Sequence, residues 1–180
     1  IEDIKKNNLN GLLVASPANP TGSMLDKNSL TKLLECSKEY NVSFISDEIY
    51  HGIEYENKAI SALEITNDCY VINSFSKYFS MTGWRIGWMI VPEDHVRQVE
   101  KVSQNLFICP PHASQITALA ALDAKEELNE NVYVYKKNRS LEKFENITLV
   151  WIGSPSTSFY LNIISKVLNK IKKEFNVDIL

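Results

Sequence analysis

The sequence predicts an α/β fold built on a mostly parallel sheet, and its first half supplies the main reasons. Three short runs rich in apolar residues, at 11–16, 42–46 and 69–73, have the length of strands buried in a sheet. A stretch with helical spacing at 26–41, beginning with a capping residue, separates the first two runs. Strands that alternate with helical connections are typical of a parallel sheet.

A fourth strand is expected at residues 86–91, and it should run antiparallel to the third. The connection from Asn73 to Arg85 has no clear room for a helical crossover. A parallel return needs about a dozen residues or more, usually helical. Arg85, which comes just before the fourth strand, should therefore lie at the same edge of the sheet as Lys77.

The second half of the chain is mostly helical. We expect helices at 93–106, 112–124, 128–144 and 165–175, and strands at 147–151, 158–164 and 177–180. The pattern changes near residue 127, so residues 1–127 should form part of a large domain and 128–180 part of a smaller α+β domain. The chain starts at Ile1 and ends as a strand begins, so we interpret it as an internal fragment of a longer protein.

Composition excludes several classes of function. The net charge is −3, which gives no reason to expect nucleic acid as a partner. No apolar run approaches the roughly 18 residues that span a bilayer, so we expect no membrane partner. The three cysteines are widely spaced, so we predict neither disulfides nor zinc, and a cytoplasmic location. The three histidines have no metal-like spacing, and we assign them no role and predict no metal site.

Polar side chains gather where the predicted strands end, which is where ligands bind in such sheets. Lys77 follows the third strand, and a lysine in a partly buried site can form a Schiff base with an aldehyde. Ser74, Ser76 and Arg85 flank it, and an arginine fork with hydroxyl groups matches phosphate oxygens. An aldehyde and a phosphate together indicate pyridoxal 5′-phosphate (PLP) as the cofactor.

Four motifs in order carry a family resemblance. They are Asn-Pro-Thr-Gly at 19–22, Asp-Glu-Ile-Tyr at 47–50, Ser-Phe-Ser-Lys at 74–77 and Gly-Trp-Arg-Ile-Gly at 83–87. From about residue 11 to 160 the chain resembles the fold-type I, PLP-dependent class I/II aminotransferases. The local sequence of the motifs is most similar to the aspartate aminotransferase-like branch. The resemblance implies the PLP-dependent transferase fold, with one antiparallel strand in a mostly parallel sheet and helices on both faces.

The resemblance also implies a role for each site residue. Lys77 would carry the Schiff base and then move the proton at the substrate α-carbon. Asp47 would pair with the pyridinium nitrogen, Asn19 and Tyr50 would bond the ring oxygen, and Glu48 would point away as a structural residue. The expected phosphate ligands are Ser74, Ser76 and Arg85. The Asn19–Pro20 bond matches a position where the family has a cis peptide.

The expected activity is transamination between an amino acid and a 2-oxo acid, in a homodimer. The family's glycine-containing phosphate loop, the stacking aromatic and the carboxylate-binding arginine lie outside this chain, so we expect the piece to be inactive by itself. Two alternatives stay open: another fold-type I PLP enzyme such as a β-lyase, and a non-catalytic fragment. The sequence does not give the substrate.

Overall fold

The computed structural model describes residues 2–7, 9–139, 148–149, 169–170 and 178–179. The chain divides into two compact units, residues 1–138 and 139–180, which we describe separately. The expected division near residue 127 falls inside helix α5 (Lys125–Arg139), which is continuous. The assignment of the two domains stays a prediction.

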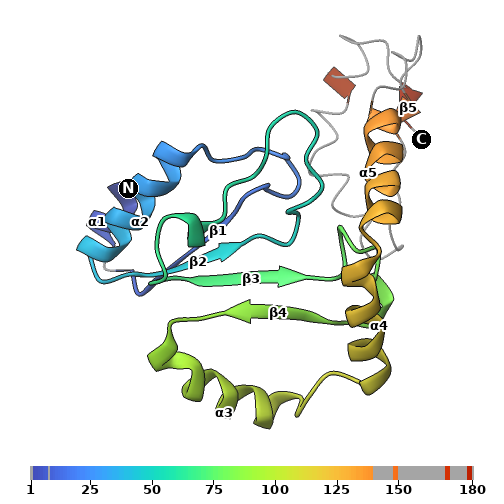
Figure 1. Ribbon diagram of the computed structural model, residues 1–180. Coiled ribbons are helices and arrows are strands. Elements are labelled where there is room, and N and C mark those ends of the chain that lie inside the picture. The colour runs from blue at the N-terminus through green and yellow to red at the C-terminus, as the bar shows by residue number, and fades with distance from the viewer. Residues whose placement is uncertain (1, 8, 140–147, 150–168, 171–177, 180) are drawn as a thin grey trace. The chain divides into compact units, whose positions relative to one another are not determined.

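The first unit contains a four-stranded sheet in the order β1–β2–β3–β4 (Figure 1). The strands are β1 (Gly11–Ala15), β2 (Ser43–Asp47), β3 (Tyr70–Ser74) and β4 (Gly87–Ile90). The first three are parallel, and β4 is antiparallel to β3. The structure confirms the mixed sheet and the direction of its fourth strand.

The register brings the functional segments to one edge of the sheet, which we call the carboxyl edge. Ala15 of β1 pairs with Asp47 of β2, and Ser74 of β3 pairs with Gly87 at the start of β4. The first three strands therefore end, and β4 begins, at the same edge. Ligands of open α/β sheets bind at this edge.

Helix α2 (Lys27–Glu39) connects β1 to β2. Asp26 is its N-cap, and the Asp26 Oδ1 accepts a hydrogen bond of 2.8 Å from the backbone N–H of Ser29. That hydrogen bond favours the charged carboxylate and lowers the pKa of Asp26. The helix ends before Asn41, whose φ of 54° is left-handed, as is common just past a helix C-terminus.

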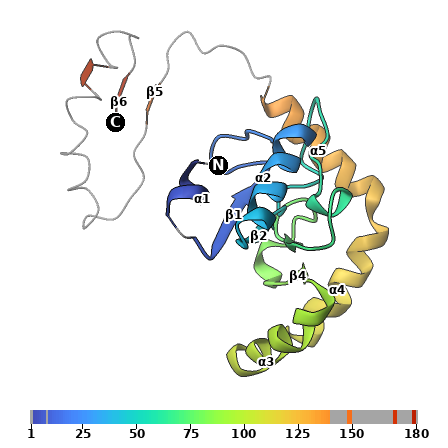
Figure 2. The same ribbon diagram turned by 90° about the vertical axis from the view of Figure 1, so that its left-hand side faces the viewer.

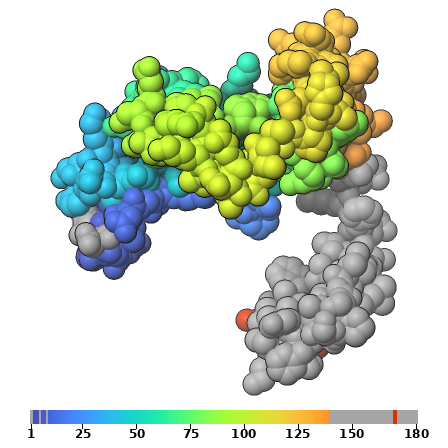
Figure 3. All heavy atoms as spheres, turned by 90° about the horizontal axis from the view of Figure 1, so that it is seen from below, coloured from blue at the N-terminus to red at the C-terminus, as the bar shows by residue number. Residues whose placement is uncertain are grey.

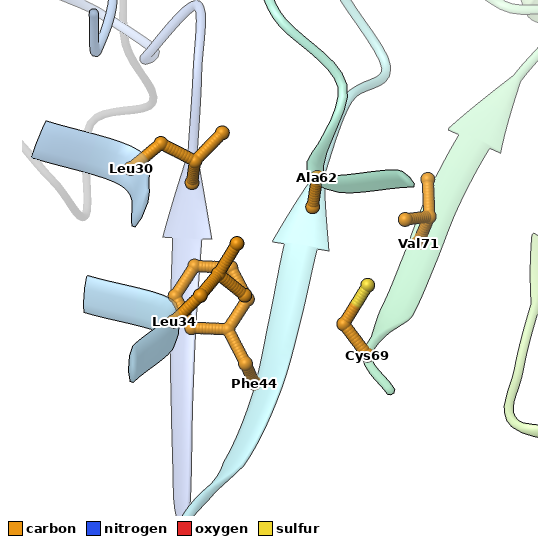
Figure 4. Packing of buried hydrophobic residues seen from close by; sticks show 6 residues of the cluster. All are labelled: Leu30, Leu34, Phe44, Ala62, Cys69 and Val71. Carbon is orange, nitrogen blue, oxygen red and sulfur yellow. The ribbon is translucent and has the colours of Figure 1, made fainter. Parts of the chain in front are cut away.

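The main core lies between α2 and the sheet (Figure 4). Leu30 and Leu34 of the helix pack over Phe44 of β2 and Val71 of β3, and each is at least 93% buried. Each such side chain contributes roughly 2 kcal/mol by leaving water. Cys69 lies in the same cluster, and burial raises the pKa of its thiol to about 11, so it acts as a small apolar side chain.

The other helices of the first unit (Figure 2) include three short ones that the sequence did not predict, at residues 2–6, 62–64 and 82–84. In chain order these other helices are α1 (Glu2–Lys6), η1 (Ala62–Glu64), η2 (Thr82–Trp84), η3 (Glu93–His95), α3 (Val96–Leu106) and α4 (His112–Asp123), followed by α5. The helix expected at 93–106 begins as a 3₁₀ turn, as helix N-termini often do, and Pro92 is the N-cap of that turn. Pro111 is the N-cap of α4, which confirms the predicted break between the two helices. Side chains of α3 and α4 form much of the face shown in Figure 3.

In the second unit, β5 (Thr148–Leu149) pairs in parallel with β6 (Asp178–Ile179), and residues 169–170 are helical. These positions agree with the strands expected at 147–151 and 177–180 and the helix expected at 165–175. The strand expected at 158–164 lies outside the described residues.

Candidate active site

The carboxyl edge carries the residues that the sequence singled out. Asp47 is the last residue of β2 and Ser74 the last of β3. Lys77 lies in the turn after β3, and Arg85 lies in the connection that leads into β4. Their positions follow from the strand register and need no helix packing to bring them together.

The turn that carries Lys77 is closed and anchored by apolar side chains. Met81 N–H donates to the Phe75 carbonyl at 3.0 Å, and both side chains are buried against α4. Phe79 packs on Phe75 with ring centroids 4.6 Å apart. Because these side chains hold the turn from one side, Lys77 stays half-buried at the edge instead of extending freely into water.

Lys77 lies beside Tyr50, a second predicted site residue. The Lys77 Nζ is 5.5 Å from the centroid of the Tyr50 ring, within the range of a cation–π contact. Tyr50 is half-buried in the turn that follows β2. The structure therefore brings together an amine and a phenol from two neighbouring strand ends.

Ser74, Ser76 and Arg85 form a second group, which we call the Ser–Arg cluster. The Ser76 N–H donates to Ser74 Oγ at 3.0 Å, and Arg85 Nη1 donates to Ser76 Oγ at 3.5 Å. Arg85 Nη1 also donates to the Thr82 carbonyl at 2.9 Å. Two hydroxyls and an exposed guanidinium converge there, and this set of donors fits a phosphate.

Arg85 has a left-handed backbone, with φ 51° and ψ 50°. This conformation costs a non-glycine residue about 1–2 kcal/mol, and it turns the chain from η2 into β4. Strained residues cluster at ligand sites. The conformation places the guanidinium over Ser76, so the strain and the Ser–Arg cluster arise from the same turn.

The structure does not join Asp47 and Asn19 to these groups by side-chain contacts. Asp47 Oδ1 accepts from Ile49 N–H at 3.2 Å, and Asn19 is exposed in the turn after β1. Within the described ranges, no hydrogen bond connects either side chain to the other site residues. The Asn19–Pro20 peptide is cis, as expected, and so is Ser16–Pro17, which the sequence analysis missed.

Glu48 has the structural role that was predicted for it. Its side chain is buried, and Oε1 accepts hydrogen bonds from Ser46 Oγ, Ser61 Oγ and Ala62 N–H at 3.0, 3.1 and 2.8 Å. These donors come from β2 and from the connection to β3. The buried carboxylate therefore fixes that connection beneath the carboxyl edge.

Sequence reasoning missed two residues at this edge. Thr82 supplies the carbonyl that holds Arg85, and its hydroxyl donates to the Ser76 carbonyl at 2.8 Å. His51, to which no role was assigned, contacts Ser16 and Glu48. Their only signal in the sequence was their place next to recognised motifs.

A hollow of about 350 Å³ lies at the opposite edge of the sheet, lined in part by Ser37, Tyr70 and His95. Tyr70 begins β3, so this hollow is far along the strands from Lys77. The Ser37 hydroxyl oxygen is buried and has no hydrogen-bond partner. The predicted site residues lie at the carboxyl edge and not at this hollow.

The mixed sheet and its helices define the PLP-dependent transferase fold. The chain belongs to the aminotransferase class I and II family, whose model matches residues 1–178. It is 42% identical over 137 residues to valine–pyruvate aminotransferase from Mycobacterium tuberculosis, covering 74% of the chain and 35% of that protein. It is 34% identical over 178 residues to aspartate aminotransferase from Sulfurisphaera tokodaii, covering 94% of the chain and 45% of that protein.

Solved structures agree with this assignment. A protein from Silicibacter pomeroyi is 65% identical to this chain, and its structure matches with a TM-score of 0.72. The match covers 76% of this chain and 37% of that protein's chain. An aminotransferase from Mycobacterium tuberculosis gives a TM-score of 0.70 at 42% identity, over 74% of this chain and 35% of that one. The chain spans less than half the length of each of these relatives. Among the helices that the structure describes, none has the length and apolar character needed to cross a membrane.

Proposed function

We propose that the protein to which this chain belongs is a PLP-dependent aminotransferase that moves an amino group between an amino acid and a 2-oxo acid. The observation that carries the proposal is the pairing at the carboxyl edge. Lys77 Nζ stands 5.5 Å from the Tyr50 ring, and the Ser–Arg cluster lies in the same loop and the strand connection after it. One group suits an aldehyde and the other suits a phosphate.

The donor set fits PLP group by group. Lys77 would bind the aldehyde carbon as a Schiff base, and the Ser–Arg cluster would hold the phosphate. Asp47 would face the pyridine nitrogen, with one carboxylate oxygen already fixed by Ile49 N–H. When bound, the protonated pyridine ring withdraws electrons from the substrate α-carbon. Asn19 and Tyr50 would bond the ring oxygen.

The residues of this chain supply binding and proton movement. With the cofactor bound, the Lys77 amine would take the proton from the substrate α-carbon and, as the ammonium, would give a proton back. The Tyr50 ring lies beside that amine. The relatives named valine–pyruvate aminotransferase and aspartate aminotransferase support amino acids and 2-oxo acids as the proposed class of substrate.

The proposal includes a cytoplasmic homodimer. Large apolar side chains are exposed on α3, on α4 and in the connection between them, and Leu106, Ile108 and Leu119 are each more than 60% exposed. Exposed apolar patches of this kind mark surfaces that other protein covers. Either the remaining part of the protein or a second subunit would cover these apolar side chains.

Borohydride reduction tests the proposal directly. The full-length protein is mixed with PLP, reduced and digested, and the modified peptide is mapped by mass spectrometry. Label on Lys77 alone supports the assignment, and Lys77→Ala should remove it. A Lys77→Ala protein that still carries the label at the site would overturn the assignment, and amino-group transfer from amino acids then separates transamination from β-elimination.

A further inference from the structure

His51 stands between the first two strand ends with both ring nitrogens engaged. Nε2 lies 3.0 Å from the Ser16 carbonyl oxygen, and Nδ1 lies 3.5 Å from Glu48 Oε2. The side chain is 20% exposed. A carbonyl oxygen only accepts, so Nε2 carries a proton and donates it to Ser16. Nδ1 pairs with the Glu48 carboxylate only in the doubly protonated ring.

Ser16 is the base of the loop that carries Asn19. Its N–H donates to the Asp47 carbonyl at 3.2 Å, and its hydroxyl accepts from Leu25 N–H at 3.0 Å. The first bond ties the loop to the end of β2, and the second closes the loop on itself. The carbonyl of Ser16 is the remaining polar group, and His51 holds it.

Glu48 fixes the other side of the imidazole. Its Oε1 already accepts three hydrogen bonds from Ser46, Ser61 and Ala62, so the carboxylate cannot rotate without losing them. Its Oε2 is the oxygen that faces His51. The imidazole therefore lies between the Glu48 carboxylate, which its three hydrogen bonds hold in place, and the base of the Asn19 loop.

We propose that His51 is a positioning residue that fixes the Asn19 loop against the turn carrying Asp47 and Tyr50. This rests on the proposed function, because those three residues are the expected ring-binding groups. Within the part of the chain that the structure describes, the polar contacts of His51 are with Ser16 and Glu48, and none is with the Ser–Arg cluster. Its loss should therefore weaken binding of the ring and leave binding of the phosphate group intact.

Two probes separate the ring from the phosphate: pyridoxal, which lacks phosphate, and inorganic phosphate. The full-length apoprotein is titrated with each, followed by absorbance for pyridoxal and by calorimetry for phosphate. His51→Phe keeps a flat ring but removes the donor, and should weaken pyridoxal about tenfold, the effect of one lost hydrogen bond. His51→Gln keeps an N–H donor for Ser16 and should fall between Phe and wild type. Phosphate affinity should stay within twofold in both variants.

The matched control is His95→Phe. His95 also bonds a partner, Tyr70 Oη at 2.7 Å, but at the opposite edge of the sheet, so its loss should leave both affinities unchanged. Equal loss of pyridoxal and phosphate binding on His51 substitution would show a general structural role and overturn the inference. Unchanged pyridoxal binding would overturn it as well. If His51→Phe does not fold, His51→Gln decides by the same two comparisons, while wild type that binds neither probe refutes the proposed function instead.

Discussion

Gly52 lies directly against the ring of Tyr78, the neighbour of Lys77. A Cβ on Gly52 would stand 2.5 Å from Tyr78 Cδ2 and 2.6 Å from Cγ, closer than real Cβ contacts come. Gly52 also has φ +94°, which disfavours any side chain. The ring is held in turn by Asn129 of α5, whose Oδ1 accepts from Tyr78 Oη at 3.0 Å. The turn after His51 therefore sets the position of the Lys77 loop.

Gly52→Ala should destabilise the full-length protein and disturb Lys77. The left-handed φ costs about 1 kcal/mol, and displacing the Tyr78 ring adds a further 1–3 kcal/mol or so. Gly22→Ala is the matched control, because Gly22 has φ +68° but nothing within 4 Å of its Cβ position. Urea unfolding of both variants measures the difference. Equal losses at the two glycines would mean that the Tyr78 contact carries no cost.

Removal of the Glu48 carboxylate should be far more damaging than removal of an exposed one. Glu48→Ala leaves the buried donors Ser46 Oγ and Ala62 N–H without an acceptor, which should cost about 3 kcal/mol or more. Glu64→Ala is the control, since Glu64 is exposed and accepts one bond, from Ser61 N–H at 3.2 Å. It should cost below about 1 kcal/mol. Unfolding midpoints in urea give both values, and similar midpoints would contradict the buried role of Glu48.

The sheet was predictable because its information is local. Each of the first three strands is a short apolar run that ends in a polar motif, so the run predicts the strand and the motif marks the edge of the sheet at which the strand ends. The direction of β4 followed from the length of its connection alone. Asp47, Ser74 and Arg85 could be placed at one edge before any contact was known.

The contacts that hold the site were not predictable, because their partners are distant or belong to the backbone. His51 binds a carbonyl 35 residues away, and every residue has a carbonyl, so no side-chain pattern reveals the pair. The left-handed backbone at Arg85 was not predictable either, because position 85 is neither glycine nor asparagine, the residues that usually signal this conformation. Helix α5 runs through the expected domain boundary because its composition changes while its backbone hydrogen bonding does not.

Asp26 should make stability depend on pH in the acid range. Hydrogen bonding from Ser29 lowers the pKa of Asp26 in the folded protein, so its contribution is present above the unfolded pKa and is lost as pH falls through the folded pKa. Asp26→Ala should therefore be less stable than wild type at neutral pH. The gap should close at acid pH below the normal carboxylate range. Asp26→Asn retains an acceptor for the cap and is the control, and its unfolding midpoint should lie between the other two at neutral pH. A gap between wild type and Asp26→Ala that is constant across this range would show that the cap does not depend on the charge.

Arg85 should be required for phosphate binding in a way that another exposed arginine is not. Arg85→Ala removes the guanidinium that donates to Ser76 Oγ, and should weaken inorganic phosphate and PLP by tenfold or more, roughly the effect of a charged hydrogen bond. Arg85→Lys keeps the charge but lacks the planar fork, so it should recover only part of the affinity. Arg97→Ala is the matched control, because Arg97 is exposed and pairs with Glu100 on α3 at 3.1 Å. Calorimetry with phosphate measures all three variants. Equal affinities of Arg85→Ala and Arg97→Ala would exclude the Ser–Arg cluster as the phosphate site, whereas full recovery by Arg85→Lys would mean that charge alone, and not the geometry over Ser76, selects the anion.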